Sequence, residues 1–138
     1  MRNRGRAVGG ILAALAIPRF MAAADRSQQN EAKQILKQVY VMEQAYRQEY
    51  DTYWGGTEWN RRDDGQKCTV IADRENGNNF ARIGVQIGVS ALYSYQIVAD
   101  ENTFTCTATA NLDDDATIDT WTMDQTGTLV NTIDDSAD

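Results

Sequence analysis

The chain has 138 residues, of which 13 are basic and 20 acidic, and its formal net charge is −7. This length suits one globular domain with an extension. The chain contains no histidine, the most common general base and zinc ligand, and no G-x-S-x-G motif, so an enzyme is not expected. After residue 62, 14 acidic residues outnumber 3 basic ones, so nucleic-acid binding is not expected there either.

The N-terminal segment, residues 1–24, is basic at first and then apolar. Residues 1–6 contain three arginines, as a positively charged leader region would. Residues 7–18 (AVGGILAALAIP) form an apolar run of 12 residues, whereas a membrane-spanning helix needs about 20. We expect a shortened membrane segment or a packing segment. The basic residues around it would suit either anionic lipid headgroups or a solvated helix face.

Residues 25–50 follow a helical pattern, with apolar side chains at steps of three and four residues. The stripe expected to carry a sheet comprises Ala32, Leu36, Val39, Tyr46 and Tyr50. The chain has no glycine or proline between Arg19 and Asp51, so the pattern predicts one helix from about Ile11 to Tyr50. Such a helix would be on the order of 60 Å long. A domain of this size cannot cover that length, so part of the helix must pack on something else.

The rest of the chain predicts a connector over residues 51–66 and an antiparallel sheet over residues 67–132. The connector is turn-rich and aromatic and is expected to lie over the helix–sheet junction. Short runs rich in β-branched and aromatic residues then alternate with Asn, Gly and Asp clusters. The predicted strands are residues 68–72, 80–88, 91–99, 103–110, 117–123 and 128–132. One long helix followed by strands indicates the α+β class.

The two cysteines, Cys68 and Cys106, lie in predicted strands and are 38 positions apart, which is not a metal-binding spacing. A structural disulfide is the favoured interpretation for an exported domain, and on the chain-entropy estimate it would stabilise the fold by about 4 kcal/mol. The alternative is two buried thiols in a reducing compartment.

The sharpest polar cluster is residues 111–119 (NLDDDATID). Side-chain oxygens recur at nearly alternate positions, a spacing that can surround a hard cation such as Ca²⁺. The candidate ligands are Asn111, Asp113, Asp115, Thr117 and Asp119. The loop departs from the EF-hand pattern because Ala116 replaces the required glycine. A solvated acidic turn is the alternative.

Residues 10–20 (GILAALAIPRF) resemble the later part of the N-terminal helix of type IV pilins and type II secretion pseudopilins. Residues 30–38 (NEAKQILKQ) are similar to the continuation of that helix into the globular domain, and residues 103–113 and 119–124 are similar to the last strands. The N-terminal residues differ from the sequence pattern of these families. Residues 1–5 resemble the end of a basic leader, but the Phe-Thr-Leu-Ile-Glu-like start has no counterpart, so we expect residues 1–24 to be a truncated or atypical form of this helix segment.

The resemblance implies a pilin-like fold and a structural subunit of an extracellular, cell-surface filament. Such a subunit forms a helical homopolymer with the help of an assembly machinery, and resides in the inner membrane beforehand. Some major pseudopilins hold calcium in the C-terminal β-region. Type II secretion pseudopilin is an alternative, and so is a monomeric secreted or membrane-tethered Ca²⁺-binding module. The residues expected to make assembly contacts are Ile11, Leu12, Leu15, Ile17, Pro18, Phe20 and Met21.

Overall fold

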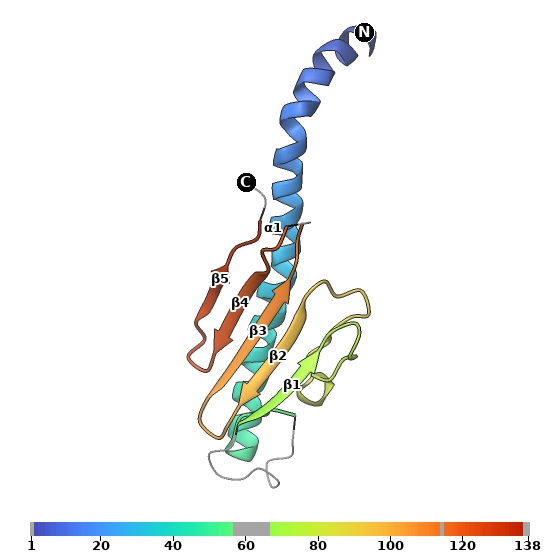
Figure 1. The fold of residues 1–138 in the computed structure, drawn as a ribbon. Coiled ribbons are helices and arrows are strands. Elements are labelled where there is room, and N and C mark those ends of the chain that lie inside the picture. Colours follow the sequence, from blue (N-terminus) through green and yellow to red (C-terminus); the bar gives the residue numbers. More distant parts are fainter. Residues whose placement is uncertain (1, 57–66, 114, 137–138) are drawn as a thin grey trace.

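The computed structural model describes residues 2–56, 67–113 and 115–136, with side chains from Arg26 onward. It contains a long helix, α1 (Arg2–Tyr50), and a five-stranded antiparallel sheet beside the C-terminal half of that helix (Figure 1). The predicted α+β class, with a long N-terminal helix on a small antiparallel sheet, is therefore confirmed.

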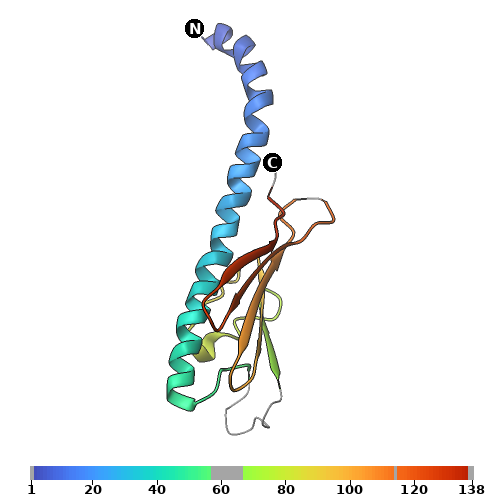
Figure 2. The same cartoon turned by 90° about the vertical axis from the view of Figure 1, so that its left-hand side faces the viewer.

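Helix α1 is much longer than the domain that it carries. Its 49 residues span about 74 Å at 1.5 Å per residue. The sheet lies along the C-terminal half, and the N-terminal half extends beyond the domain (Figure 2). Pro18 does not end the helix, which continues through this residue. A proline inside a helix removes one backbone hydrogen bond, and here the turns on either side remain helical.

One face of α1 packs on the sheet. Ala32, Leu36 and Val39 have no exposed surface, and Tyr46 is 5% exposed. Their steps of three, four and seven residues keep them on one side of a 3.6-residue helix. Tyr50, predicted to join them, is only partly buried against the core. The predicted apolar stripe is therefore the contact surface with the sheet.

The strands follow one another across the sheet in sequence order, β1-β2-β3-β4-β5, and every neighbouring pair is antiparallel. Their bounds are β1 (Cys68–Ala72), β2 (Ser94–Ala99), β3 (Phe104–Ala110), β4 (Asp119–Asp124) and β5 (Leu129–Ile133). This connectivity needs only short hairpin-type connections, except between β1 and β2.

The predicted strand at residues 80–88 is wrong. A short 3-10 helix, η2 (Ala81–Ile83), forms instead and ends at Gly84, whose φ of 82° is in the left-handed region that favours glycine. Val85 and Ile87 are buried while their neighbours are exposed. This alternation resembles a strand, but it arises because the segment lies over the core rather than within the sheet.

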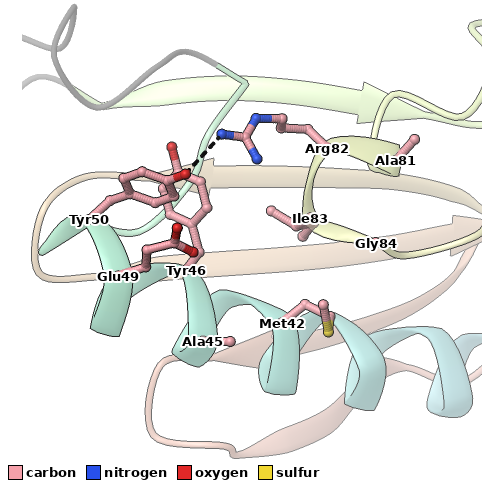
Figure 3. Close-up of a pocket in the computed structure, with 9 residues that line it drawn as sticks. All are labelled: Met42, Ala45, Tyr46, Glu49, Tyr50, Ala81, Arg82, Ile83 and Gly84. Carbon is pink, nitrogen blue, oxygen red and sulfur yellow. Dashed lines mark hydrogen bonds between the residues drawn. The ribbon is translucent and has the colours of Figure 1, made fainter.

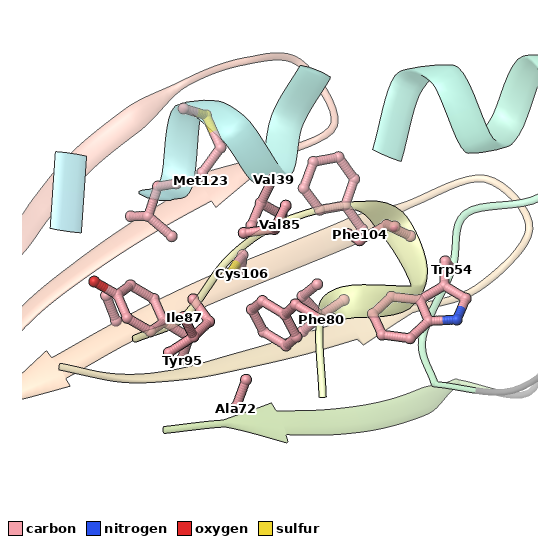
Figure 4. Packing of buried hydrophobic residues seen from close by; sticks show 14 of the residues in the cluster. Val39, Trp54, Ala72, Phe80, Val85, Ile87, Tyr95, Phe104, Cys106 and Met123 are labelled. Atoms are coloured by element: carbon pink, nitrogen blue, oxygen red, sulfur yellow. The ribbon is translucent and has the colours of Figure 1, made fainter. Parts of the chain in front are cut away.

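The core lies between α1, the inner face of the sheet and the segment around η2. Inward residues alternate along the central strands, with Tyr95 and Ile97 on β2, Cys106 on β3 and Met123 on β4. Figure 4 shows them together with residues that cover the sheet, namely Val39, Trp54, Phe80, Val85 and Ile87. Burying one large apolar side chain stabilises the fold by about 1.5–3 kcal/mol, so this cluster dominates stability.

The residues that follow α1 pack against the domain. Tyr53 and Trp54 are 5% and 3% exposed, and the Trp54 backbone N–H donates to Glu43 Oε1 over 2.7 Å. The Tyr53 N–H donates to the carbonyl of Asp100, between β2 and β3. Residues 51–56 therefore join the end of α1 to the sheet, and the remaining predicted connector, residues 57–66, lies outside the described residues.

We expect Leu36→Ala to lower the free energy of unfolding by about 2–5 kcal/mol, because it removes a fully buried side chain at the helix–sheet contact. Val41→Ala, five residues along the same helix and 60% exposed, should change it by less than about 0.5 kcal/mol. Urea unfolding followed by circular dichroism measures both. Equal losses would contradict the helix face assigned here.

Candidate functional site

The acidic segment predicted to bind a cation connects β3 to β4, whose ends pair at Ala110 and Asp119. Its side chains accept hydrogen bonds from backbone N–H groups two residues onward. Asn111 Oδ1 accepts from Asp113 N (3.2 Å), Asp113 Oδ1 from Asp115 N (2.9 Å) and Asp115 Oδ1 from Thr117 N (2.8 Å). These successive Asx turns fix the path of the loop.

Three carboxylates come together at this loop. Oxygen atoms of Asp113, Asp115 and Asp135 all lie within 4.8 Å of one another. Asp113 is half-buried, Asp115 is exposed, and Asp135 is 4% exposed. Like charges this close repel one another, and hard divalent cations prefer carboxylate oxygens. The described residues therefore contain an acidic cluster that has the donor atoms of a metal site.

Asp135 is absent from the set predicted from the sequence. It follows β5, and the pairing of Thr120 with Ile133 brings the end of that strand beside the start of β4. The Asp135 Oδ2 atom accepts the N–H of Leu112, over 2.8 Å, which ties the C-terminal segment to the loop. Only the strand order brings residues 112 and 135 together, so no local pattern signals that this carboxylate joins the cluster.

Asp119 does not belong to the cluster. It is completely buried, and its oxygens accept hydrogen bonds from the protein. Oδ2 accepts from Tyr93 Oη (2.5 Å) and Trp121 Nε1 (2.7 Å), and Oδ1 from Gln29 Nε2 (2.9 Å). Oδ1 also accepts from the backbone N–H of Asp135 (2.9 Å). A carboxylate with this many donors is a structural anchor that joins α1, the residue before β2, β4 and the C-terminal segment.

The two-residue period of β4 explains this placement. Asp119, Trp121 and Met123 are buried, and the residues between them are half-buried. The same network raises the pKa of Tyr93, first because the phenol is buried and then because it donates to Asp119. Tyr93 therefore stays protonated and keeps donating throughout the neutral range.

Thr117 and Asn111, the remaining predicted ligands, are both exposed. The Asn111 Nδ2 group donates to the carbonyl of Asp115 over 2.8 Å, so its amide helps to close the loop. Of the three predicted aspartate ligands, the structure brings Asp113 and Asp115 together with Asp135, and Asp119 lies apart from them.

The predicted disulfide between Cys68 and Cys106 is not formed in the structure, where both residues are thiols. Cys68 is on β1 and pairs with Ala99, whereas Cys106 is on β3 and pairs with Ile97, so β2 lies between them. Two strand spacings, with an offset of two residues along the strands, place their Cα atoms about 12 Å apart, beyond the about 7 Å that a disulfide spans. Burial, with a smaller contribution from Glu43, raises the pKa of the Cys106 thiol, so it stays protonated.

The predicted assembly residues, from Ile11 to Met21, lie on the part of α1 that extends beyond the domain (Figure 1). Their backbone is helical, and their side chains lie outside the described ones. In the part of the chain that the structure describes, no helical stretch is both long and apolar enough to cross a bilayer.

Comparisons of the chain with protein-family models, with curated proteins and with solved structures find no match. Function is therefore inferred from the chain's own geometry.

We expect Asp119→Ala to lower the free energy of unfolding by about 3 kcal/mol or more, because it leaves the buried Tyr93 and Trp121 donors without their acceptor. Asp115→Ala, at an exposed site in the same segment, should cost less than about 1 kcal/mol in calcium-free buffer. Denaturant titration compares the two. A cost for Asp119→Ala no larger than that for Asp115→Ala would show that the network does not hold the fold.

Proposed function

We propose that this chain is a structural subunit of an extracellular, type IV pilus-like filament that assembles through the N-terminal half of α1. The observation that carries the proposal is the mismatch between helix and domain. The sheet covers only the C-terminal half of a 49-residue helix, while residues 7–24 continue it with an almost entirely apolar sequence (Figure 2).

The physical reason for assembly is the hydrophobic effect. An apolar helix without a partner in its own chain is unfavourable in water, so it packs on lipid or on copies of itself. Gly9, Gly10, Ala13, Ala14 and Ala16 are small, which lets helix backbones approach closely. In the proposed filament these helices form the core and the β-domains form the outer surface.

The proposal includes the partners and locations that such a subunit needs. The subunit would be held at the inner membrane before assembly, would interact with a pilus or secretion assembly machinery, and would then form a helical homopolymer on the cell surface. The threonine-rich β3 and β4 (FTCTATA and DTWTMD) favour a pilus over the alternative, a type II secretion pseudopilus. The proposal assigns the chain a structural role and no catalytic activity.

Electron microscopy of sheared cell-surface material, with intact mass of the recovered subunit, tests the proposal. We expect filaments that contain this chain. Leu15→Asp should abolish them while leaving the circular dichroism of the protein unchanged, because it buries an unpaired charge in the helical core. Val130→Asp, at an exposed position on β5, should leave filaments intact. A strictly monomeric unsubstituted chain, or filaments that tolerate Leu15→Asp, would contradict the proposal.

The acidic cluster supports a second property. We propose that Asp113, Asp115 and Asp135 bind Ca²⁺, with the loop carbonyls and water completing its coordination. The support is the convergence of three carboxylates, one of them 4% exposed, on one point. If filaments do not form, this property favours the alternative of a monomeric secreted or membrane-tethered Ca²⁺-binding module.

Differential scanning calorimetry with millimolar Ca²⁺ or chelator tests the calcium proposal. A ligand that binds only the folded state stabilises it by about 2.7 kcal/mol at one hundred times its dissociation constant, so Ca²⁺ should raise the melting temperature. Asp113→Asn combined with Asp135→Asn should remove this shift. Asp73→Asn, a turn aspartate outside the cluster, should retain it. No shift in the unsubstituted chain would leave the segment as a solvated acidic turn.

A further inference from the structure

A groove runs along α1 on the side that faces η2. It consists of two adjoining hollows of about 330 and 300 Å³, which share Met42 and Gly84. Residues 37–50 of α1 form one wall and residues 81–84 the other. We call it the α1–η2 groove. It lies beside the face of α1 that packs on the sheet, and Tyr46 borders both.

The groove has an apolar floor with charged residues beside it. Val41, Met42 and Ile83 line it, together with Lys37, Glu49 and Arg82. Val41 is 60% exposed, although the sheet buries the stripe on the opposite side of the same helix. Gly84 has no side chain, which lets the wall formed by residues 81–84 approach α1 closely. A Cβ placed at Gly84 would lie 3.1 Å from Met42 Cε. At the far end, the Arg82 guanidinium lies over the Tyr46 and Tyr50 rings, 5.6 and 5.7 Å from their centroids (Figure 3). Arg82 also donates to Tyr50 Oη, so this end is pre-organised.

We propose that the α1–η2 groove receives residues 7–20 of α1 from a second copy of this chain. This inference rests on the proposed filament function and assigns one of its contact surfaces. The groove extends over 14 residues of helix, about 20 Å, and the apolar segment 7–20 has the same length. Its own chain cannot supply this segment, because both belong to one continuous helix.

Charge sets the direction and stagger of the contact. Arg19 is the only charged residue between Arg6 and Asp25, and Glu49 is exposed at the far end of the groove. The Arg82 guanidinium at the same end is held over the Tyr46 and Tyr50 rings, and Lys37 lines the opposite end. Two parallel helices staggered by 30 residues place Arg19 opposite Glu49 and Leu12 opposite Met42. The same stagger places Ile11 opposite Val41. Thirty residues correspond to an axial displacement of about 45 Å between the copies.

Cysteine cross-linking of assembled filaments tests the contact. The full chain carries Leu12→Cys with Met42→Cys in a Cys68→Ser background, and Cys106 is too buried to react. A short bifunctional thiol reagent should then give a ladder of dimers and higher multimers on denaturing gels. Each cross-link must join two copies, because residues 12 and 42 of one helix are about 45 Å apart. Leu12→Cys with Val130→Cys, at an exposed apolar position outside the groove, should give no ladder.

The outcomes separate this inference from the proposed function. Filaments that form without the Leu12–Met42 ladder overturn the groove contact and leave the filament standing. An unsubstituted chain that forms no filaments overturns both. A ladder that includes the Val130 control at equal yield also overturns the groove contact, because the cross-linking is then unspecific.

A charge exchange provides a second measurement if the cysteine variants do not assemble. Arg19→Glu should reduce filament mass by about tenfold, since it opposes two like charges at a contact. Adding Glu49→Arg to the same chain should restore filaments. Failure of this second substitution to rescue the first would overturn the proposed stagger.

Discussion

The packing of one face of α1 on the sheet is the interaction on which the rest of the structure depends. Polar contacts from the helix fix this packing at both of its ends. Near the protruding half, the Glu31 carboxylate accepts from the Leu92 and Tyr93 backbone N–H groups and from Tyr95 Oη. Near the other end, the Arg47 Nε group donates to the carbonyl of Glu101. These bonds are directional, so they set the position of the sheet along a helix whose apolar stripe alone would permit sliding by a turn.

This arrangement divides α1 among different environments. Between Ala32 and Tyr46 the helix contributes to the core of its own domain, and beyond the domain the same helix continues with an apolar sequence. The face that lines the α1–η2 groove is a third environment, where Val41 is the most exposed large apolar side chain of α1 among the described residues. One face of the helix is therefore packed within its own domain, while the N-terminal apolar segment and the groove remain available for contacts with other copies. Such contacts between copies are the basis of the proposed filament.

Local periodicity predicted the features that depend on local rules and missed those that depend on strand order. The helix stripe and β1 were predicted because 3.6-residue and two-residue periods report which side chains are buried. Residues 80–88 were mistaken for a strand because alternating burial, here of Val85 and Ile87, does not require a hydrogen-bonded neighbour. The prediction of a disulfide was wrong because β2 lies between the strands that carry the two cysteines. Asp135 was missed because only the pairing of β4 with β5 brings it to Asp113, whereas the period of β4 could have shown that Asp119 points inward.

Charge links the two proposed properties. The acidic cluster lies at the end of the sheet from which the protruding half of α1 emerges, and nearby Asp134 also contributes negative charge. The pKa of Asp134 is lowered by hydrogen bonds from Ser136, and to a smaller extent by Gln29 and Arg26, so this carboxyl stays ionised to lower pH than usual. A filament would bring many such acidic ends close together, and exposed charges within about 10 Å repel one another at ordinary salt. A cation held by Asp113, Asp115 and Asp135 would reduce that repulsion between the acidic ends of neighbouring copies. On the proposed function, calcium binding therefore favours assembly as well as the fold of a single subunit.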